Sequence, residues 1–550
     1  MTASVHSSET ENAKSADYEV LIVGAGVTGL YQLHRAREHR WSVRLLEAGS
    51  GVGGTWYWNR YPAARTDSEA YTYGYFTPKE LLAEWNWTEH FASQPELEAY
   101  FNKFVNDYDL RRDIEFDARV VSAVYSEVGS LWTVTTSNGK KFTATYLIAA
   151  SGVLSVPFYP SFPGTDTFRG LTCHTATWPR DGVDLAGKRV ALIGTGSSGV
   201  QLVPAIIDEV QSLTVYQRTP NWAMPLNNCA LSAAEQEEIR SGYPALYERL
   251  QRTSGGFLHE DATKNAFDDT VEARRAHYED LWNGRGMRAM FSTYADVLTN
   301  PAANADFSEF LAQKIRSIVK DPETADKLIP KDHGFGMKRP PLETGYYEAY
   351  NKPNIELVDL RENPILRFTT TGIESADTTR EFDVIIYATG FDAFTGALTR
   401  MGIRGLNGVS LEKYWAEGPF TYLGVAVPGF PNLLIDSGPH GTFGNIPRSA
   451  EVQVDFVTGL VNHARSNGFN LIDAAEAAAE DWTAHVYEGA QHFAQSAGSW
   501  YVGGNIPGKA KKFLPYSWGI PIYREKLNEV ANNGYRGFRF AHVAAEAAVS

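Results

Sequence analysis

The glycine spacing G-x-G-x-x-G occurs twice in this chain, each time after an apolar, β-branched run and before a helix-like run. In the first copy, YEVLIVGAGVTGLYQLHRAREHRWSVRLLE, the glycines are Gly24, Gly26 and Gly29. Such glycines allow a tight turn, a close approach of backbone N–H groups to a pyrophosphate, and close packing of helix on strand. Glu47 ends the second strand 18 residues after Gly29. Its carboxylate can accept hydrogen bonds from a ribose with a free 2′-hydroxyl, which predicts FAD or NAD here.

The second copy, KRVALIGTGSSGVQLVPAIIDEVQSLTVYQRT, has a cation where the first copy has a carboxylate. Its glycines are Gly194, Gly196 and Gly199, and its second strand ends at Arg218, 19 residues after Gly199. A guanidinium at that point favours a 2′-phosphate by charge and bidentate geometry, and the Thr219 hydroxyl can add to it. This copy is therefore predicted to bind NADP(H) rather than NAD(H). The alternative is an exposed basic strand end without a ligand.

Two such units predict an α/β fold with two Rossmann-like dinucleotide-binding domains. The apolar runs 143–152 and 382–392 end in small residues and are expected to return the chain past a bound nucleotide. Between about Ser232 and Leu328 the helical periodicity predicts a helical insertion packed on the NADP domain. One apolar face in it, expected to be core, comprises Phe307, Phe310, Leu311, Ile315 and Ile318. The predicted boundaries are 1–152 and 381–540 for a discontinuous FAD domain, 153–230 and 330–380 for the NADP domain, 231–329 for the insertion, and 541–550 for a tail.

Length, charge and cysteine content narrow the classes of protein. At 550 residues the chain is long enough for about two to four domains. A formal net charge of −15, without a long Lys/Arg run, argues against nucleic acid as a partner. No apolar run reaches the about 18 residues that span a bilayer, and the N-terminus lacks signal-peptide features, so the cytoplasm is expected. Cys173 and Cys229 lie too far apart for a Cys-x-x-Cys pair. No metal site is predicted, and a monomer or weak homo-oligomer is expected.

The segment FRGLTCHTATWP, just before the second glycine copy, reads as neither a helix nor a strand. It fits F-x-G-x-x-x-H-x-x-x-W-P at every fixed position, and this pattern resembles the fingerprint of the type I Baeyer–Villiger monooxygenases. These are flavoproteins that insert oxygen beside a ketone carbonyl. The resemblance continues in GVGGTWYWNRYPAARTD, KDHGFGMKRPPLETGYYEAYN, ATGFDAFTGAL, GPHGTFGN and SWYVGGNIPGK. The fingerprint positions are Phe168, Gly170, His174, Trp178 and Pro179.

The resemblance implies an NADPH- and FAD-dependent enzyme that converts ketones to esters or lactones with O2 through a flavin C4a-peroxide anion. Arg339 would be the fixed cation that keeps this anion unprotonated, because a guanidinium does not give up its own proton. Asp67 would orient Arg339 and offset its charge. Lys338 would be a second ligand of the 2′-phosphate, beside Arg218 and Thr219. Pro340 and Pro341 depart from the aliphatic residues common in the family at these positions and are expected to change the substrate pocket.

Further roles are implied by the same resemblance. Trp500 would lie on a mobile loop that closes over NADP, and Gln201 would touch the pyrophosphate. His174 would position the two domains, while the alternative is a buried histidine with satisfied hydrogen bonds. The GPHGTFGN loop is expected either to line the ketone pocket or to serve as scaffold. The remaining expected cofactor contacts are Trp56, Tyr73, Val120, Ser197 and Ser198.

Three other functions remain as alternatives at this point. A pyridine nucleotide-dithiol reductase shares the double glycine pattern but needs a cysteine pair. A flavin-containing monooxygenase that oxidises nitrogen or sulfur is the main alternative, although Trp178, Pro179 and Arg339 argue against it. A non-catalytic flavin-binding module would bind FAD without turning over NADPH. The sequence leaves open which ketone is the substrate.

Overall fold

The structure is a computed structural model that describes residues 16–493 and 498–544. Its first large sheet has eight strands, in the order β17-β4-β5-β6-β1-β2-β3, and β18 also pairs with β6. Pairing is parallel except at β4–β5 and β5–β6. The strands are β1 (Tyr18–Val23), β2 (Val43–Leu46), β3 (Ile114–Glu115), β4 (Val120–Ser126), β5 (Leu131–Thr136), β6 (Lys141–Ala149), β17 (Ile403–Arg404) and β18 (Leu433–Ile435).

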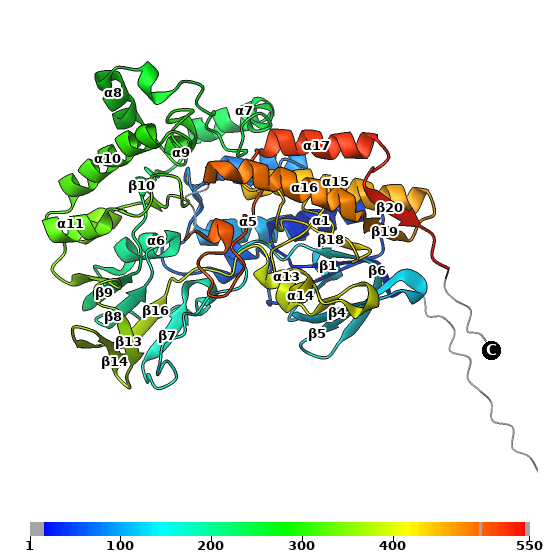
Figure 1. Cartoon of the computed structure of the whole chain (residues 1–550), viewed down its shortest axis with the longest axis horizontal. Helices are drawn as coiled ribbons and strands as arrows, with labels where there is room; N and C mark the ends of the chain where they lie inside the picture. The colour runs from blue at the N-terminus through cyan, green and yellow to red at the C-terminus, as the bar shows by residue number, and fades with distance from the viewer. Residues whose placement is uncertain (1–15, 494–497, 545–550) are drawn as a thin grey trace, which may run out of the picture.

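A second, wholly parallel sheet lies beside the first and has the order β12-β9-β8-β16-β7. Figure 1 shows it at the lower left, with the first sheet to its right. Its strands are β7 (Leu171–His174), β8 (Arg189–Ile193), β9 (Ser212–Gln217), β12 (Ile355–Asp359) and β16 (Val384–Tyr387). The smaller sheets pair β10 (Met224–Pro225) with β11 (Leu342–Glu343), β13 (Ile365–Phe368) with β14 (Gly372–Ser375) and β15 (Thr379–Glu381), and β19 (Leu471–Ala474) with β20 (Phe538–Ala541).

Both predicted strand–helix–strand units are confirmed. The helix α1 (Val27–Glu38) connects the parallel neighbours β1 and β2, and α6 (Ser197–Ile206) connects β8 and β9. The apolar parts of β1 (residues 20–23) and β8 (residues 190–193) are buried, as expected for parallel sheets covered on both faces. The α/β fold class with two Rossmann-like units is therefore confirmed, and the carboxyl ends of both sheets are the places where dinucleotides bind in such folds.

Two predictions about the second sheet need correction. The boundary placed at residue 381 assigned the run 382–392 to the first domain, but β16 is an inner strand of the second sheet, between β8 and β7. Residues 171–174, expected to be neither helix nor strand, form the edge strand β7. Both errors have one cause, because a strand is assigned to a sheet by its neighbours in space and not by its own composition. The other domain boundaries stay predictions.

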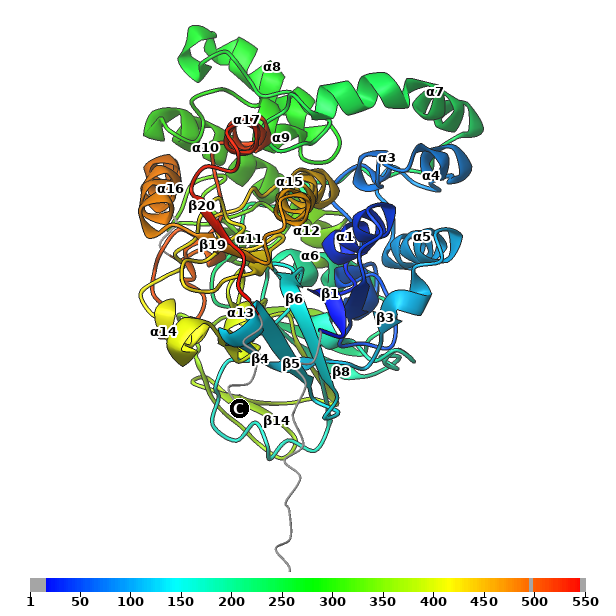
Figure 2. The same cartoon turned by 90° about the vertical axis from the view of Figure 1, so that its right-hand side faces the viewer.

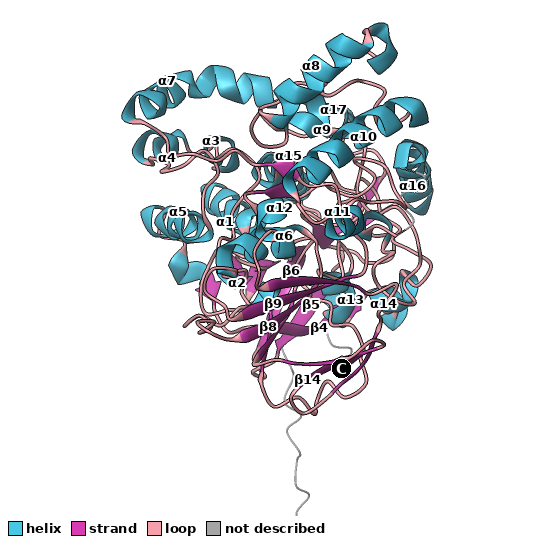
Figure 3. Ribbon diagram, turned by 90° about the vertical axis from the view of Figure 1, so that its left-hand side faces the viewer, coloured by secondary structure: helices cyan, strands magenta, loops and turns pink. Residues whose placement is uncertain are grey.

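The region 231–329 is helical, as predicted, with α7 (Ala233–Leu250), α8 (Val271–Trp282), α9 (Arg288–Ser292), α10 (Pro301–Ile318) and α11 (Pro322–Leu328). The apolar face of α10 packs into the core of the second sheet. The helix α7 differs, since Tyr243 and Leu250 are buried with residues of the first sheet's core. Figures 2 and 3 show α7 next to α3 and α4, so the insertion covers both halves and not the NADP side alone.

The remaining helices cover the first sheet and the junction between the two sheets. The long helix α15 packs against α1 and α17 above the first sheet (Figure 1). No helix in residues 16–493 and 498–544 is long and apolar enough to cross a membrane. The predicted tail begins at the end of β20, and its residues 545–550 lie outside the described part. The helices are α2 (Thr55–Trp58), α3 (Ala70–Tyr73), α4 (Lys79–Glu84), α5 (Gln94–Asp107), α12 (Tyr346–Ala349), α13 (Gly396–Arg400), α14 (Leu411–Tyr414), α15 (Ile446–Ser466), α16 (Glu476–Gly489) and α17 (Ile520–Asn532).

Candidate active site

The first glycine turn leaves the start of α1 open to a phosphate. Gly24 has a φ of +106°, and a Cβ there would lie 2.6 Å from the carbonyl oxygen of Ala150, so only glycine fits. Gly26 precedes the helix, and among the described residues no side chain caps its first turn. Backbone N–H groups and the helix dipole therefore point into the space where a pyrophosphate binds in this fold. Gly29 packs against the turn itself, since an added Cβ would meet the Gly24 carbonyl oxygen.

Glu47 lies buried just past the carboxyl end of β2, where the sequence places a ribose ligand. Its Oε2 accepts a hydrogen bond from Ala25 N (2.6 Å) and its Oε1 accepts one from Gly49 N (2.8 Å). Burial raises the pKa of Glu47, and these two hydrogen bonds oppose the shift. Each carboxylate oxygen keeps a second lone pair for a ribose hydroxyl. Val120 is buried at the start of β4. It lies close to Glu47 along the fold, because the N–H of Ala118, two residues earlier, donates a hydrogen bond to the Glu47 carbonyl.

The second glycine turn repeats this geometry and is tied to the flavin-side stretch 51–67. Gly194 has a φ of +112°, and the described residues leave open space around the position of a Cβ on Gly196. Gln201, on the first turns of α6, donates from Nε2 to the Arg65 carbonyl (3.2 Å) and accepts at Oε1 from the Tyr61 hydroxyl (2.8 Å). Burial raises the pKa of Tyr61, and nearby Ser198 acts against this shift. Tyr61 was not predicted, although it lies within a segment that was.

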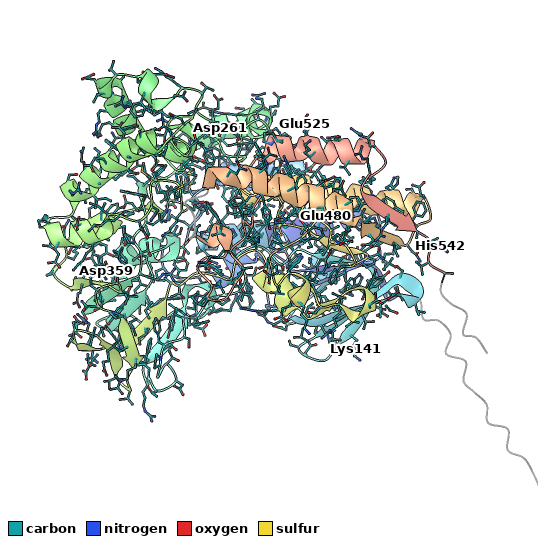
Figure 4. The ribbon with its side chains drawn as sticks, in the orientation of Figure 1. Lys141, Asp261, Asp359, Glu480, Glu525 and His542 are labelled. Carbon is teal, nitrogen blue, oxygen red and sulfur yellow. The ribbon has the colours of Figure 1, made fainter. Side chains whose placement is uncertain are left out.

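Three cations gather where a 2′-phosphate is expected. Burial lowers the pKa of Lys338, and the nearby guanidinium groups of Arg218 and Arg361 lower it further, against the pull of Asp332. Arg361 is held by Asp359, with Nη2 2.7 Å from Oδ2. Figure 4 labels Asp359, which ends β12 near α11. Arg361 was missed by the sequence analysis, and its position just past a strand end of the second sheet is the signal that could have found it.

Arg339 and Asp67, far apart in the sequence, form an ion pair with Nη2 2.6 Å from Oδ2. Their side chains are 25% and 22% exposed, so the pair is mostly shielded but open on one side. Burial acts to lower the pKa of Arg339, but Asp67 and Tyr501 more than offset this and raise the pKa. Arg339 is therefore a permanent cation at the junction of the flavin-side stretch and the second sheet.

Aromatic side chains enclose this ion pair. Burial raises the pKa of Tyr501 to about 12, with Arg339 lowering and Asp67 raising it, so the hydroxyl lies within electrostatic reach of both charges. Tyr73 is also buried and responds to the same two charges. Its hydroxyl accepts a hydrogen bond from Trp56 Nε1 (3.3 Å). Buried rings near the ion pair lower the local polarity and so strengthen its electrostatic field.

Trp500 lies on a segment that is fastened to two predicted loops. Its ring stacks on Phe394, with centroids 5.8 Å apart and planes at 22°, and meets the edge of Phe443 at 5.6 Å. Further along, Lys509 Nζ lies 2.6 Å from Asp392 Oδ1. Phe443 belongs to GPHGTFGN, so this loop and the Trp500 segment, predicted separately, are brought together. Residues 494–497 of the expected mobile loop lie outside the described residues.

His174 is fully buried and both ring nitrogens have partners. Nδ1 accepts from Ala176 N (2.9 Å), and Nε2 lies 3.3 Å from the hydroxyl oxygen of Thr389. Burial lowers the pKa of His174 to about 4, so the ring is neutral. This geometry favours a structural role between β7 and the segment after β16. Of the other fingerprint residues, Gly170 lies tight against the Asp383 carbonyl oxygen and Trp178 is buried in the core. Phe168 is half-buried and packs against the edge of the core, and Pro179 begins the following turn.

Comparison with known proteins decides the family. Residues 17–229 match the family described as flavin-binding monooxygenase-like. The chain is 41% identical over 525 residues to the acetone monooxygenase (methyl acetate-forming) of Gordonia sp. (strain TY-5), covering 94% of this chain and 98% of that protein. The chain belongs to the type I Baeyer–Villiger monooxygenases. This Baeyer–Villiger monooxygenase oxidises ketones to esters or lactones and uses FAD and NADPH.

Two further likenesses bear on cofactor and substrate. A crystal structure of OTEMO in complex with FAD and NADP superposes with a TM-score of 0.93 at 42% identity, covering 96% of this chain and 100% of that one. The phenazine N-monooxygenase of Lysobacter antibioticus is 40% identical over 525 residues, covering 95% of this chain and 96% of that protein. The chain is thus similarly identical to a protein named for acetone oxidation and to one named for phenazine N-oxidation.

Proposed function

We propose that Arg339 is the catalytic cation of this Baeyer–Villiger monooxygenase and that Asp67 orients it. The proposal is supported mainly by the 2.6 Å ion pair between them, which is mostly shielded and lies near buried aromatic side chains. When bound, NADPH supplies the hydride and FAD the group that activates O2. Arg339 keeps its own proton, so it can hold an anion in the site without neutralising it. Asp67 fixes the guanidinium plane and balances its charge when no anion is present.

We further propose that the two glycine turns hold the two dinucleotides. Open N–H groups at α1 and α6, the ribose carboxylate and the cation group fit FAD on the first turn and NADP(H) on the second. The proposed FAD contacts are Gly24, Gly26, Gly29, Glu47, Trp56, Asp67, Tyr73 and Val120. The proposed NADP(H) contacts are Gly194, Gly196, Ser197, Ser198, Gly199, Gln201, Arg218, Thr219, Lys338 and Trp500.

Replacing the cation tests its role directly. In Arg339→Ala, NADPH should still reduce the bound flavin, while ester formation from a ketone panel should fall at least about 100-fold, as when a preorganised charge is removed. Arg339→Lys should recover part of the ester because it restores the charge but not the planar fork. The matched control is Arg367→Ala, which removes an exposed ion pair with Glu374 on the β13–β14 hairpin. Normal ester yield from Arg339→Ala would contradict the assignment.

Oxidation of a nitrogen or sulfur atom is the second candidate activity, favoured by the likeness to the phenazine N-monooxygenase. Sulfides and N-heterocycles therefore belong in the same panel, with products identified by mass spectrometry. Residual heteroatom oxidation by Arg339→Ala, without ester, would assign the cation to ketone oxidation alone. We also propose a cytoplasmic location and a monomer or weak homo-oligomer, which cell fractionation and light scattering would check.

A further inference from the structure

The main chain at Arg339 is held from one side by a single asparagine side chain. Asn221 Nδ2 donates a hydrogen bond to the Arg339 carbonyl oxygen at 2.8 Å. Its Oδ1 accepts from Trp222 N (2.9 Å), which fixes the orientation of the amide. Asn221 lies three residues after Arg218, the expected 2′-phosphate ligand at the end of β9. It therefore joins the end of β9 to the loop of residues 333–341, which carries Arg339.

Neighbouring hydrogen bonds extend this link along both segments. The indole Nε1 of Trp222 donates to the His333 carbonyl at 3.1 Å. Met224 N donates to the Pro341 carbonyl at 3.0 Å. The β10–β11 pairing begins with the next residue, Leu342, which pairs with Met224. His333 Nε2 also lies 3.4 Å from Asn221 Oδ1, so one main-chain and three side-chain hydrogen bonds fasten residues 333–341 to residues 221–224. The bond from Asn221 Nδ2 is the one that reaches Arg339 itself.

The α10 side of the 333–341 loop is also held by hydrogen bonds, since Asn304 Nδ2 donates to the Phe335 carbonyl (2.9 Å) and Phe335 N donates to Ser308 Oγ (3.1 Å). A cavity of about 400 Å³ lies beside these contacts and is lined by His333, Gly334 and Met337 as well as by Trp222. The hydrogen bonds from α10 hold the loop at Phe335, four residues before the cation. The bond from Asn221 acts at the main chain of Arg339 itself.

We propose that Asn221 is a positioning residue, which sets the place of Arg339 relative to Arg218 and so couples the phosphate end of the NADP(H) site to the catalytic cation. The inference rests on the proposed role of Arg339. In this role Asn221 acts through the main chain of another residue, by its hydrogen bond to the Arg339 carbonyl. A ligand that orders the strand end at Arg218 also orders Arg339 through this hydrogen bond.

Two substitutions test the link. Asn221→Ala removes the amide, and Asn221→Asp keeps its size and its acceptor for Trp222 N while replacing the donor that faces the Arg339 carbonyl. Each variant, loaded with FAD, is assayed at saturating NADPH with a ketone that the wild type oxidises. Ester formed per NADPH consumed should fall about 10-fold, with hydrogen peroxide making up the difference, because misplacement by about 1 Å can cost up to about 100-fold. Flavin reduction at saturating NADPH should keep the wild-type rate.

A second readout does not depend on turnover. Hydrogen–deuterium exchange of peptides covering 333–341 should rise in both variants, and NADP+ should slow that exchange in the wild type but not in the variants. The matched control is Asn354→Ala, an asparagine of the same sheet whose Nδ2 donates to the Ile207 (2.9 Å) and Val210 (3.1 Å) carbonyls. This control should change neither the ester formed per NADPH consumed nor the hydrogen–deuterium exchange of residues 333–341.

The outcomes separate this inference from the proposal about Arg339. Suppose that Arg339→Ala forms no ester, while both Asn221 variants keep the wild-type ester yield per NADPH and the wild-type exchange of residues 333–341. Asn221 then has no positioning role. If Arg339→Ala keeps the ester, the proposal about the cation fails whatever the Asn221 variants do. If Asn221→Ala does not retain FAD, Asn221→Asp decides the question alone. In the double variant with Arg339→Ala, loss of Asn221 should bring no further loss of coupling.

Discussion

Lys338 is an ammonium group placed among other positive charges. Because burial, Arg218 and Arg361 lower its pKa, it loses its proton at a lower pH than an ordinary lysine, whose pKa is about 10.4. A bound phosphate would favour the charged form and raise the pKa again. The affinity of the site for NADPH should therefore depend on pH in the alkaline range.

The KM for NADPH should rise as the pH increases from neutral toward the ordinary lysine pKa, because the deprotonated amine no longer attracts the 2′-phosphate. Lys338→Arg should flatten this profile, since a guanidinium stays charged throughout. Initial rates at several NADPH concentrations, measured at each pH, would show the slope. If the KM for NADPH changes with pH in the same way in the wild type and in Lys338→Arg, Lys338 is not the cause of the pH dependence.

Single residues were predictable where a local pattern defines their surroundings. The glycines of the two turns, Glu47 and Arg218 follow from their spacing alone, because strand, turn and helix fix where each residue lies. Arg361 and Asn221 were missed because they matter only through contacts between segments far apart in the sequence. Asp67 and Arg339 were assigned by resemblance, since no spacing rule relates residues so distant.

At the scale of elements, the short 3₁₀ turn η7 (Trp500–Val502) is held down by an ion pair on the same segment. Lys509 Nζ contacts Asp392 Oδ1 and also the Ala393 carbonyl (2.9 Å), with both charged side chains mostly buried. Removing one partner from such a pair leaves the other charge without compensation, which costs about 3 to 5 kcal/mol for a fully buried pair and less here. The segment should then detach more often.

Asp392→Asn should therefore speed trypsin cleavage after Lys509, Lys511 and Lys512, and NADP+ should slow that cleavage again if Trp500 closes over the nucleotide. Fragments identified by mass spectrometry over a time course would report the rate. Asp377→Asn, which breaks an ion pair with Arg380 at the β14–β15 turn, is the control and should leave this site unchanged. Equal cleavage in wild type and Asp392→Asn would show that the ion pair does not hold the segment.

Elements were predictable in proportion to their apolar content. The inner strands β1, β6, β8 and β9 were found because each contains an apolar or β-branched stretch, and the α10 face was found because it forms a clear helical stripe. The edge strand β7 has an exposed first half, and only pairing with β16 makes it a strand. The helix α7 could not be placed from its sequence, because its weak apolar face does not indicate which half of the molecule covers it.

On the scale of the whole molecule, Asp436 makes the stability depend on pH. It follows β18, is 1% exposed, and in the described part of the chain neither carboxyl oxygen has a hydrogen-bond partner. Burial raises its pKa to about 8. In the unfolded chain an aspartate has a pKa of about 4, so between these values the folded state binds one more proton, and stability falls as the pH rises.

Asp436→Asn should remove this slope, which is at most about 1.4 kcal/mol per pH unit. The variant should melt at a higher temperature than the wild type at pH 7.5, and the difference should shrink toward pH 5, where both side chains are uncharged in the folded state. Thermal melts of the FAD-loaded protein across this range would measure it. A difference that stays constant with pH would mean that the carboxyl does not titrate as its burial requires.

The pairing of β18 with Leu147–Ala149 of β6 has a consequence for biosynthesis. The first half of β6 pairs with β5, which is synthesised just before it. The second half pairs on the same edge with β18, which leaves the ribosome only after all strands of the second sheet have been made. At about 5 to 20 residues per second, that wait lasts roughly 15 to 60 s. During it the nascent chain presents an apolar, unpaired edge, which makes this enzyme a natural client for chaperones that shield such edges.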